Sequence, residues 1–269
     1  MDDRPIGVFD SGFGGLTVAR AMIDLLPAED IVYVGDTGRY PYGPKPPDDV
    51  RRFARQITTL LTNAHDVKMV VVACNTAAAT ALDELRFEYD VPLVGVIEPG
   101  ARAAIKVTRN HRIGVIGTVG TIASGAYQRT VAAHRSGVHV TCAACPGFVE
   151  FVERGDTRSD QVHVLAERLL APITAAGADT LLLGCTHYPF LARTIGDVMG
   201  PQVVLVSSAD ETAFEVRAIL EETGLGRRSA GKGQHRWISS GDVHTFRQLG
   251  RRLFGPEIEE VEGWDPDYV

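Results

Sequence analysis

The sequence is poor in cysteine, in runs of basic residues and in long apolar segments. Four cysteines in 269 residues are too few for a disulfide-stabilised scaffold, so we expect free thiols in a reducing compartment. Charged residues interrupt every apolar stretch well short of the ~20 residues that a transmembrane helix needs, which predicts no membrane association. The first residues also lack the basic region that precedes the apolar core of a secretory signal. These absences predict a cytoplasmic protein.

Acidic residues outnumber basic ones, with 34 Asp and Glu against 27 Lys and Arg and a net charge of −7. Because basic residues form no long run, nucleic acid is not expected to be the main ligand. At ~150 residues per domain, a chain of this length forms one large domain or two small ones.

Short apolar runs rich in β-branched residues alternate with segments of helical period. Such alternation is typical of α/β folds whose parallel strands are buried on both faces. The predicted strands are 6–9, 31–34, 69–73, 93–97, 113–116, 138–142, 181–183 and 203–206, and the predicted helices include 16–26, 49–61, 210–223 and 244–254.

The two halves of the chain are similar to each other. IGVFDSGFGG from Ile6 is similar to IGVIGTVGTI from Ile113, and VVVACNT from Val70 to LLLGCTH from Leu181, both offset by about 110 residues. We therefore predict two pseudo-symmetric α/β lobes, each a mostly parallel sheet flanked by helices, with the active site in the cleft between them. Residues 1–97 and 208–269 are assigned to the first lobe and 98–207 to the second. The Gly-rich stretch 224–233 is predicted to be a flexible loop.

Polar or nucleophilic residues follow most of the predicted strands, where open parallel sheets bind ligands. Cys74 and Cys185 share one setting, because each follows an apolar strand and precedes a predicted helix, whose free amides would lower the thiol pKa. Either cysteine alone is explained as a small buried apolar residue. The same placement in both repeats favours chemistry, since two thiols on facing lobes reach opposite faces of one small molecule.

The glycine-rich turn 10–15 lacks the G-x-G-x-x-G spacing of dinucleotide sites, and Asp10 would repel a phosphate. Glycines also simply permit tight backbone turns. Because an acid suits an ammonium group better, Asp10 and Ser11 are predicted to hold the amino end of an amino acid.

Cys142 and Cys145 form a C-x-x-C, which suits a redox pair or half of a zinc site. No second C-x-x-C and no paired histidine spacing accompanies it, so we expect two buried structural thiols and no metal. His187 is placed to act as the acid or base partner of Cys185, although a capping or core role also explains it.

A proline-rich loop contains Tyr42 and Gly43, whose backbone amides are candidates to bind a carboxylate, although turn chemistry alone accounts for its composition. The hydroxyls of Thr118 and Thr121 could act in the same way or cap a helix. Asp36 follows the second predicted strand and is a candidate supporting residue.

Six strings resemble those of the glutamate racemases of bacterial cell-wall synthesis, and together they span essentially the whole chain. They are VFDSGFGGLTV at Val8, YVGDTGRYPYG at Tyr33, ACNTAAA at Ala73, GVIEPG at Gly95, GVIGTVGTI at Gly114 and GCTHYP at Gly184. The resemblance implies a cofactor-independent racemase, without metal, pyridoxal phosphate or nucleotide, that supplies D-glutamate for peptidoglycan synthesis. It also implies a homodimer. Some members of that family are linked to inhibition of DNA gyrase, on which this sequence carries no signal.

The resemblance assigns roles residue by residue. Cys74 and Cys185 match the two catalytic thiols, with Cys74 deprotonating D-glutamate and Cys185 deprotonating L-glutamate. Asp10 and His187 match the polar groups that assist the thiols, and Glu153 matches a family acid near the site of the second lobe. The positions that match substrate contacts are Ser11, Tyr42, Gly43, Asn75, Thr76, Thr118, Thr121 and Thr186.

Two positions depart from the family pattern. Gly147 and Glu150 stand where many members carry a bulky apolar residue and a proline, which predicts a differently shaped loop before Glu153.

Inversion of an α-carbon needs a base on one face and an acid on the other, which two thiols provide. An aspartate racemase of the same superfamily would also keep both thiols, although His187 favours glutamate by resemblance. A Cys-His hydrolase would use Cys185 with His187 and leave Cys74 without a role. A non-catalytic amino-acid-binding protein would leave the α-proton in place.

Overall fold

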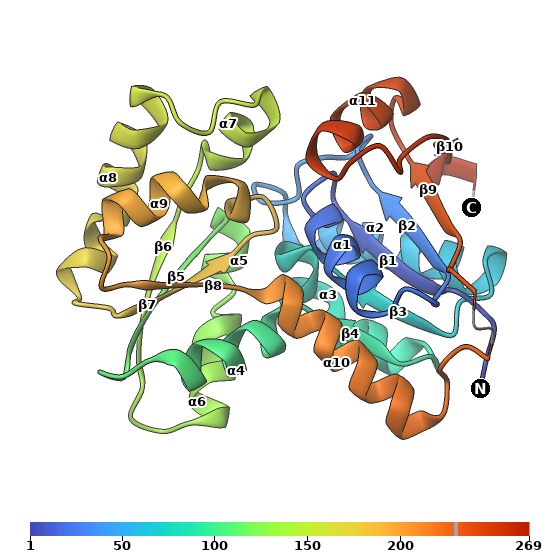
Figure 1. Ribbon diagram of the computed structural model, residues 1–269, viewed down its shortest axis with the longest axis horizontal. Helices are drawn as coiled ribbons and strands as arrows, with labels where there is room; N and C mark the ends of the chain where they lie inside the picture. Colours follow the sequence, from blue (N-terminus) through green and yellow to red (C-terminus); the bar gives the residue numbers. More distant parts are fainter. Residues whose placement is uncertain (229–230, 269) are drawn as a thin grey trace.

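The computed structural model describes residues 1–228 and 231–268, which form two parallel sheets flanked by helices (Figure 1). The first sheet has six strands in the order β10-β9-β2-β1-β3-β4. Its strands are β1 (Ile6–Asp10), β2 (Ile31–Gly35), β3 (Met69–Val72), β4 (Leu93–Gly95), β9 (His235–Ser239) and β10 (Glu262–Gly263). All of its strand pairs are parallel.

The second sheet has four parallel strands in the order β6-β5-β7-β8. They are β5 (Arg112–Gly117), β6 (His139–Ala144), β7 (Thr180–Gly184) and β8 (Val204–Ser207). This order repeats the run β2-β1-β3-β4 of the first sheet, with β5 in the place of β1 and β7 in the place of β3. The similar sequence segments at Ile6 and Ile113, and at Val70 and Leu181, therefore occupy equivalent strands.

Helices cover the faces of both sheets (Figure 1). They are α1 (Leu16–Leu25), α2 (Pro47–Thr59) with the π-helical turn η1 (Leu60–Ala64), α3 (Asn75–Glu88), α4 (Ile97–Val107), α5 (Val119–Ala123), α6 (Ala126–His134), α7 (Phe148–Arg154), α8 (Asp160–Ala175), η2 (Tyr188–Leu191), α9 (Ala192–Met199), α10 (Ser208–Thr223), α11 (Val243–Leu253) and η3 (Pro266–Tyr268). None of the helices described is long and apolar enough to cross a membrane.

The central strands are buried on both faces, which explains their continuous apolar runs. Every residue of β1, β2, β3 and β7 is buried. The chain returns to the first sheet through α10, which packs on α1 as well as on α4. Strands of the first sheet thus come from residues 6–95 and 235–263, and strands of the second from 112–207. The lobe boundaries at 97/98 and 207/208 stay a prediction.

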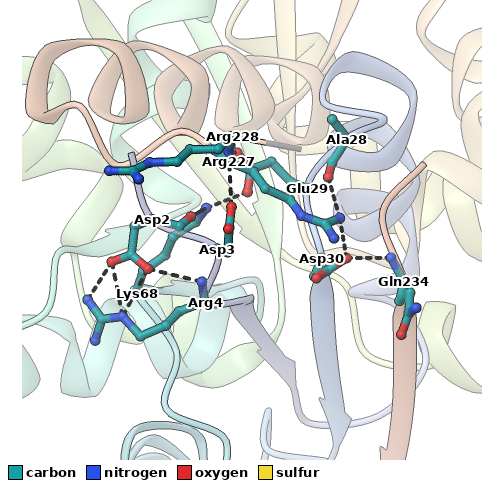
Figure 2. A network of polar contacts seen from close by, with 10 residues as sticks. All are labelled: Asp2, Asp3, Arg4, Ala28, Glu29, Asp30, Lys68, Arg227, Arg228 and Gln234. Carbon is teal, nitrogen blue, oxygen red and sulfur yellow. Dashed lines mark hydrogen bonds and ion pairs between the residues drawn. The ribbon is translucent and has the colours of Figure 1, made fainter. Parts of the chain in front are cut away.

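A buried ion pair lies at the amino ends of β2 and β3 (Figure 2). Lys68 Nζ lies 2.5 Å from Glu29 Oε2 and donates to the carbonyl of Asp2 at 2.9 Å. The other carboxylate oxygen of Glu29 accepts from the backbone of Arg227, and Asp3 accepts from the backbone of Arg228. Part of the stretch predicted to be a flexible loop is therefore anchored. Residues 229 and 230 of that stretch lie outside the described residues.

Candidate active site

The carboxyl ends of β1, β3 and β7 meet at one small cavity between the two sheets. Both Cys74 and Cys185 line it, and they are only 5% and 6% exposed. The cavity lining is Ser11, Tyr40, Pro41, Tyr42, Gly43, Cys74, Asn75, Thr76, Thr118, Val149, Cys185, Thr186 and His187. Most of the predicted site residues are thus brought together. Asp10, Asp36, Thr121 and Glu153 lie behind this lining and contact it.

Cys74 lies directly before α3, as its N-cap residue. Its Sγ donates a hydrogen bond to the hydroxyl of Ser11 at 3.7 Å. Burial and the nearby Asp10 carboxylate raise the pKa of Cys74 to about 12, although the backbone amide of Ala77 acts in the opposite direction. The predicted lowering of this pKa by the helix is therefore wrong, because desolvation outweighs the helix amides. Cys74 holds its proton at neutral pH.

Cys185 lies in a different local setting from Cys74. The residues after it form the short 3₁₀ helix η2, with Pro189 in its first turn, before α9 begins at Ala192. The helix predicted after Cys185 is therefore a short 3₁₀ helix, and it begins three residues after the thiol. Its polar neighbour is a side chain, since Cys185 Sγ lies 3.9 Å from His187 Nδ1.

His187 is buried and links Cys185 to Glu153. Its Nε2 lies 3.2 Å from Glu153 Oε1. Burial lowers the pKa of His187, but the contacts with Cys185 and Glu153 outweigh burial and raise it to about 10. His187 therefore carries a proton on each ring nitrogen at neutral pH, one of them directed at the Cys185 sulfur. Glu153 thus lies next to the cavity lining through its contact with His187.

Asp10 is 1% exposed and contacts residues at the carboxyl ends of strands in both sheets. It accepts hydrogen bonds from the backbone of Gly12 at 2.9 Å and from the hydroxyl of Thr186 at 3.3 Å. Burial raises the pKa of Asp10, opposed by the charge of His187. A Cβ on Gly14 would collide with Thr186 Oγ1 and His187 Nδ1, so the glycine lets the first-lobe turn approach the second lobe.

Hydroxyl groups join the two lobes at the other side of the cavity. Thr76 Oγ1 lies 2.9 Å from Thr118 Oγ1 and 3.2 Å from Thr121 Oγ1. Thr118 also caps α5 by accepting from the backbone of Thr121. The backbone of Gly120 donates to the carbonyl of Gly43 at 2.9 Å, which ties the proline-rich loop to the second lobe.

Asp36 is fully buried and supports the proline-rich loop from behind. It accepts hydrogen bonds from the hydroxyl of Tyr42 and from Ser240 Oγ, and it forms an ion pair with Arg39 at 2.9 Å. The hydroxyl of Tyr42 therefore points away from the cavity. A ligand would meet the ring and backbone of this residue instead.

Cys142 in β6 and Cys145 just after it are free thiols, and Cys145 is buried as predicted, whereas Cys142 is only partly buried. Burial raises the pKa of Cys142 to about 11 and that of Cys145 to about 12. In the described part of the chain, no three His, Cys, Asp or Glu side chains cluster in a way that could hold a metal ion.

The loop before α7 differs from the family pattern at Gly147, which has a φ of +94°. A bulky residue would be strained in this conformation. The predicted difference in the shape of this loop stays a prediction, and α7 places Glu153 against His187.

Sequence reasoning assigned no role to three residues of the lining, Tyr40, Pro41 and Val149, although the first two lie in the proline-rich loop. Tyr40 packs its ring against His187, with ring centroids 6.2 Å apart. The string RYPYG placed Tyr40 beside Tyr42, and this was the only signal available.

The fold and site define an α/β protein with two buried thiols facing one cavity between repeated sheets. The model of the Asp/Glu/Hydantoin racemase family matches residues 6–215, and the chain belongs to this family.

Named relatives match over nearly their full length. The glutamate racemase of Acidothermus cellulolyticus is 52% identical over 97% of this chain and 99% of its own. The crystal structure of glutamate racemase from Thermus thermophilus in complex with β-chloro-D-alanine has a TM-score of 0.90 and 43% identity, with all of both chains covered. That of Francisella tularensis in complex with D-glutamate has a TM-score of 0.93 and 31% identity, again over all of both chains.

Proposed function

We propose that this protein is a glutamate racemase that interconverts L- and D-glutamate by moving the α-proton between Cys74 and Cys185. The observation that carries the proposal is that two thiols, one after a strand of each sheet, line a single cavity. Glutamate as the substrate is supported by the relatives, which are named glutamate racemases at about half identity over nearly the full length. The reaction needs no metal, pyridoxal phosphate or nucleotide in this proposal.

The proton transfer starts with one thiolate and one thiol. From L-glutamate, Cys185 removes the α-proton on one face of the carbon, and Cys74 returns its own proton on the other face. From D-glutamate the two cysteines exchange roles. The raised pKa of Cys74 and the proton on His187 fit this assignment, because Cys74 then rests as a donor and His187 can exchange a proton with Cys185.

Most of the barrier is lowered by stabilising charge on the carbanion in a site that excludes water. The amide of Asn75 and the hydroxyls of Thr76 and Thr186 are the proposed donors to the α-carboxylate. Asp10 and Ser11 are proposed to hold the ammonium group. The remaining substrate contacts are assigned to the backbone of Tyr42 and Gly43 and to the hydroxyls of Thr118 and Thr121, with Asp36 and Glu153 as supporting residues.

The test is the circular dichroism of L-glutamate incubated with the purified protein and no added cofactor. The signal should decay to zero, because enantiomers have equal free energies in water and racemisation runs to an equal mixture. Pre-treatment with EDTA should leave the rate unchanged. A signal that persists would contradict the proposal, and activity that EDTA removes and zinc restores would contradict its cofactor-free part.

The same assay separates the alternatives. An aspartate racemase would racemise L-aspartate faster than L-glutamate, and a binding protein would leave the optical signal unchanged. A Cys-His hydrolase would tolerate Cys74→Ala, yet Cys74 lines the same cavity as Cys185.

Family membership supports the remaining parts of the proposal: a cytoplasmic location, a homodimer and supply of D-glutamate to peptidoglycan synthesis. Sedimentation velocity of the purified protein tests the dimer. No feature of the described residues bears on an interaction with DNA gyrase.

A further inference from the structure

Tyr127 of α6 is a buried residue that lies outside the cavity lining yet contacts the segment that carries each thiol. Its side chain is 1% exposed. The hydroxyl donates a hydrogen bond to Asn75 Oδ1 at 2.5 Å. Asn75 follows Cys74 directly, so this bond crosses from the second lobe to the turn of the first-lobe thiol.

The ring of Tyr127 packs on the other thiol-bearing turn. Gly184 directly precedes Cys185, and a Cβ on this glycine would lie 2.9 Å from Tyr127 Cε2. Such a distance is too short for a real contact, so the glycine leaves the space that the ring fills. One side chain therefore contacts the neighbours of both cysteines.

The amide nitrogen of Asn75 has no partner among the described residues, although it is buried. An unpaired buried amide is destabilising, which favours a partner that a ligand supplies. Asn75 lines the cavity, so its free nitrogen is available to a bound carboxylate. Burial and the nearby Cys185 raise the pKa of Tyr127, which keeps its hydroxyl protonated as a donor.

We infer that Tyr127 is a positioning residue, which holds the Asn75 amide with its nitrogen towards the α-carboxylate of the substrate and packs between the two thiol-bearing turns. The inference rests on the proposed racemisation and adds to it a residue that does not touch the substrate. Without the hydroxyl, the amide of Asn75 is free to rotate by half a turn. Its oxygen would then face the carboxylate, and the two acceptors would repel each other.

The first test is Tyr127→Phe, which keeps the ring against Gly184 and removes only the hydroxyl. We expect kcat/KM for glutamate to fall about tenfold, the size of a lost hydrogen bond to a charged group. The fall must be equal in both directions, because the equilibrium constant between enantiomers is one. Tyr89→Phe is the matched control, since the Tyr89 hydroxyl is hydrogen-bonded to Thr59 in a partly buried position outside the cavity and should be dispensable.

The double mutant distinguishes positioning from a merely structural role. If Tyr127 acts through Asn75, Tyr127→Phe should cost nothing further in an Asn75→Ala background. A tenfold loss that is the same in both backgrounds would overturn the inference, as would wild-type kcat/KM in Tyr127→Phe. In either case an active wild-type protein leaves the proposed function intact, whereas an inactive wild-type protein contradicts the proposed function itself.

A crystal structure of the wild-type protein with D-glutamate provides a measurement that does not depend on the folding of a variant. The Asn75 side chain should contact the α-carboxylate while the Tyr127 hydroxyl stays on Oδ1. A complex in which Asn75 does not contact the substrate would overturn the inference.

Discussion

At the residue scale, the two proposed bases have unlike surroundings. Cys74 lies beside Ser11 and the raised-pKa carboxyl of Asp10, whereas Cys185 lies beside His187, whose other nitrogen contacts Glu153. This asymmetry fits a division of labour, because each enantiomer presents its α-proton to one face only. Each half-reaction can therefore be isolated by removing one thiol.

The first prediction concerns Cys74→Ser and Cys185→Ser, which keep a proton donor and remove most of the basicity. Each should nearly abolish racemisation. With β-chloroglutamate, chloride loss follows proton abstraction, so one base suffices. Cys185→Ser should then release chloride only from the D-substrate and Cys74→Ser only from the L-substrate. Equal release from both enantiomers by either variant would refute the assignment of one face to each thiol.

A second prediction follows from the pKa of His187, raised from 6.5 to about 10 by Cys185 and Glu153 against the effect of burial. Because its pKa is higher in the folded than in the unfolded chain, protonated His187 stabilises the fold. This stabilisation is complete below about pH 6.5 and is lost as the pH rises towards 10. The free energy of unfolding of wild type minus that of His187→Gln should therefore shrink between these limits in urea titrations. His163→Gln, at a partly exposed histidine outside the cavity, provides the control. A difference that stays constant or grows would show that His187 is not held as a cation.

At the scale of elements, the strands were predictable because burial on both faces leaves an uninterrupted apolar run. The predicted strand 31–34 and observed β2 (Ile31–Gly35) differ by one residue, and 113–116 became β5 (Arg112–Gly117). β9 and β10 were not predicted, because an outer position in the sheet does not demand an apolar run, and their sequences are short and partly polar.

Site residues were predictable where a reactive side chain lies at the end of a strand. They were unpredictable where their position depends on packing between distant parts of the sequence. Asp10 ends a strand, and Cys74 and Cys185 come just after strands, so the fold class alone places all three at one edge. Tyr127 reaches Asn75 across 52 positions of sequence, and no local pattern encodes such a contact. The pKa of Cys74 was misjudged for the same reason, since burial and the Asp10 charge arise only in the folded chain.

A third prediction tests the glycine-rich turn as a packing element. In Gly14→Ala the added methyl group would collide with Thr186 and His187, which should cost about 1–3 kcal/mol of stability and most of the activity. Gly226→Ala is the control, because no heavy atom lies within 4 Å of its added Cβ. Both are measured by urea unfolding and by the circular dichroism assay. Normal activity in Gly14→Ala would show that the close approach between the lobes is dispensable.

At the scale of the whole molecule, the buried ion pair and the proposed active site lie at opposite ends of the first sheet. The Lys68–Glu29 pair lies at the amino ends of the strands, while the cavity lies at their carboxyl ends. The pair joins the N-terminal segment to the chain that follows α10 (Figure 2). Removing the pair should therefore lower the stability of the fold without changing the rate of turnover.

The fourth prediction is that Lys68→Met lowers the free energy of unfolding by about 3–5 kcal/mol, because it leaves the buried Glu29 carboxylate without its cation. Below the unfolding temperature, kcat/KM should stay within about twofold of wild type, a shift of under 1 kcal/mol. Arg55→Met breaks the exposed pair with Glu88 and should cost less than about 1 kcal/mol. Equal destabilisation by both variants, or a large loss of activity in folded Lys68→Met, would contradict this separation.

The central claim is that two thiols on different lobes act on opposite faces of one carbon, and racemisation in deuterated water tests it most directly. Starting from L-glutamate, early D-glutamate should carry deuterium at Cα, because Cys74 donates a solvent-derived proton. The remaining L-glutamate should stay unlabelled, because Cys185 returns the proton that it removed. D-glutamate that retains the original hydrogen would show that a single base carries the proton between the two faces, and would contradict the two-thiol mechanism.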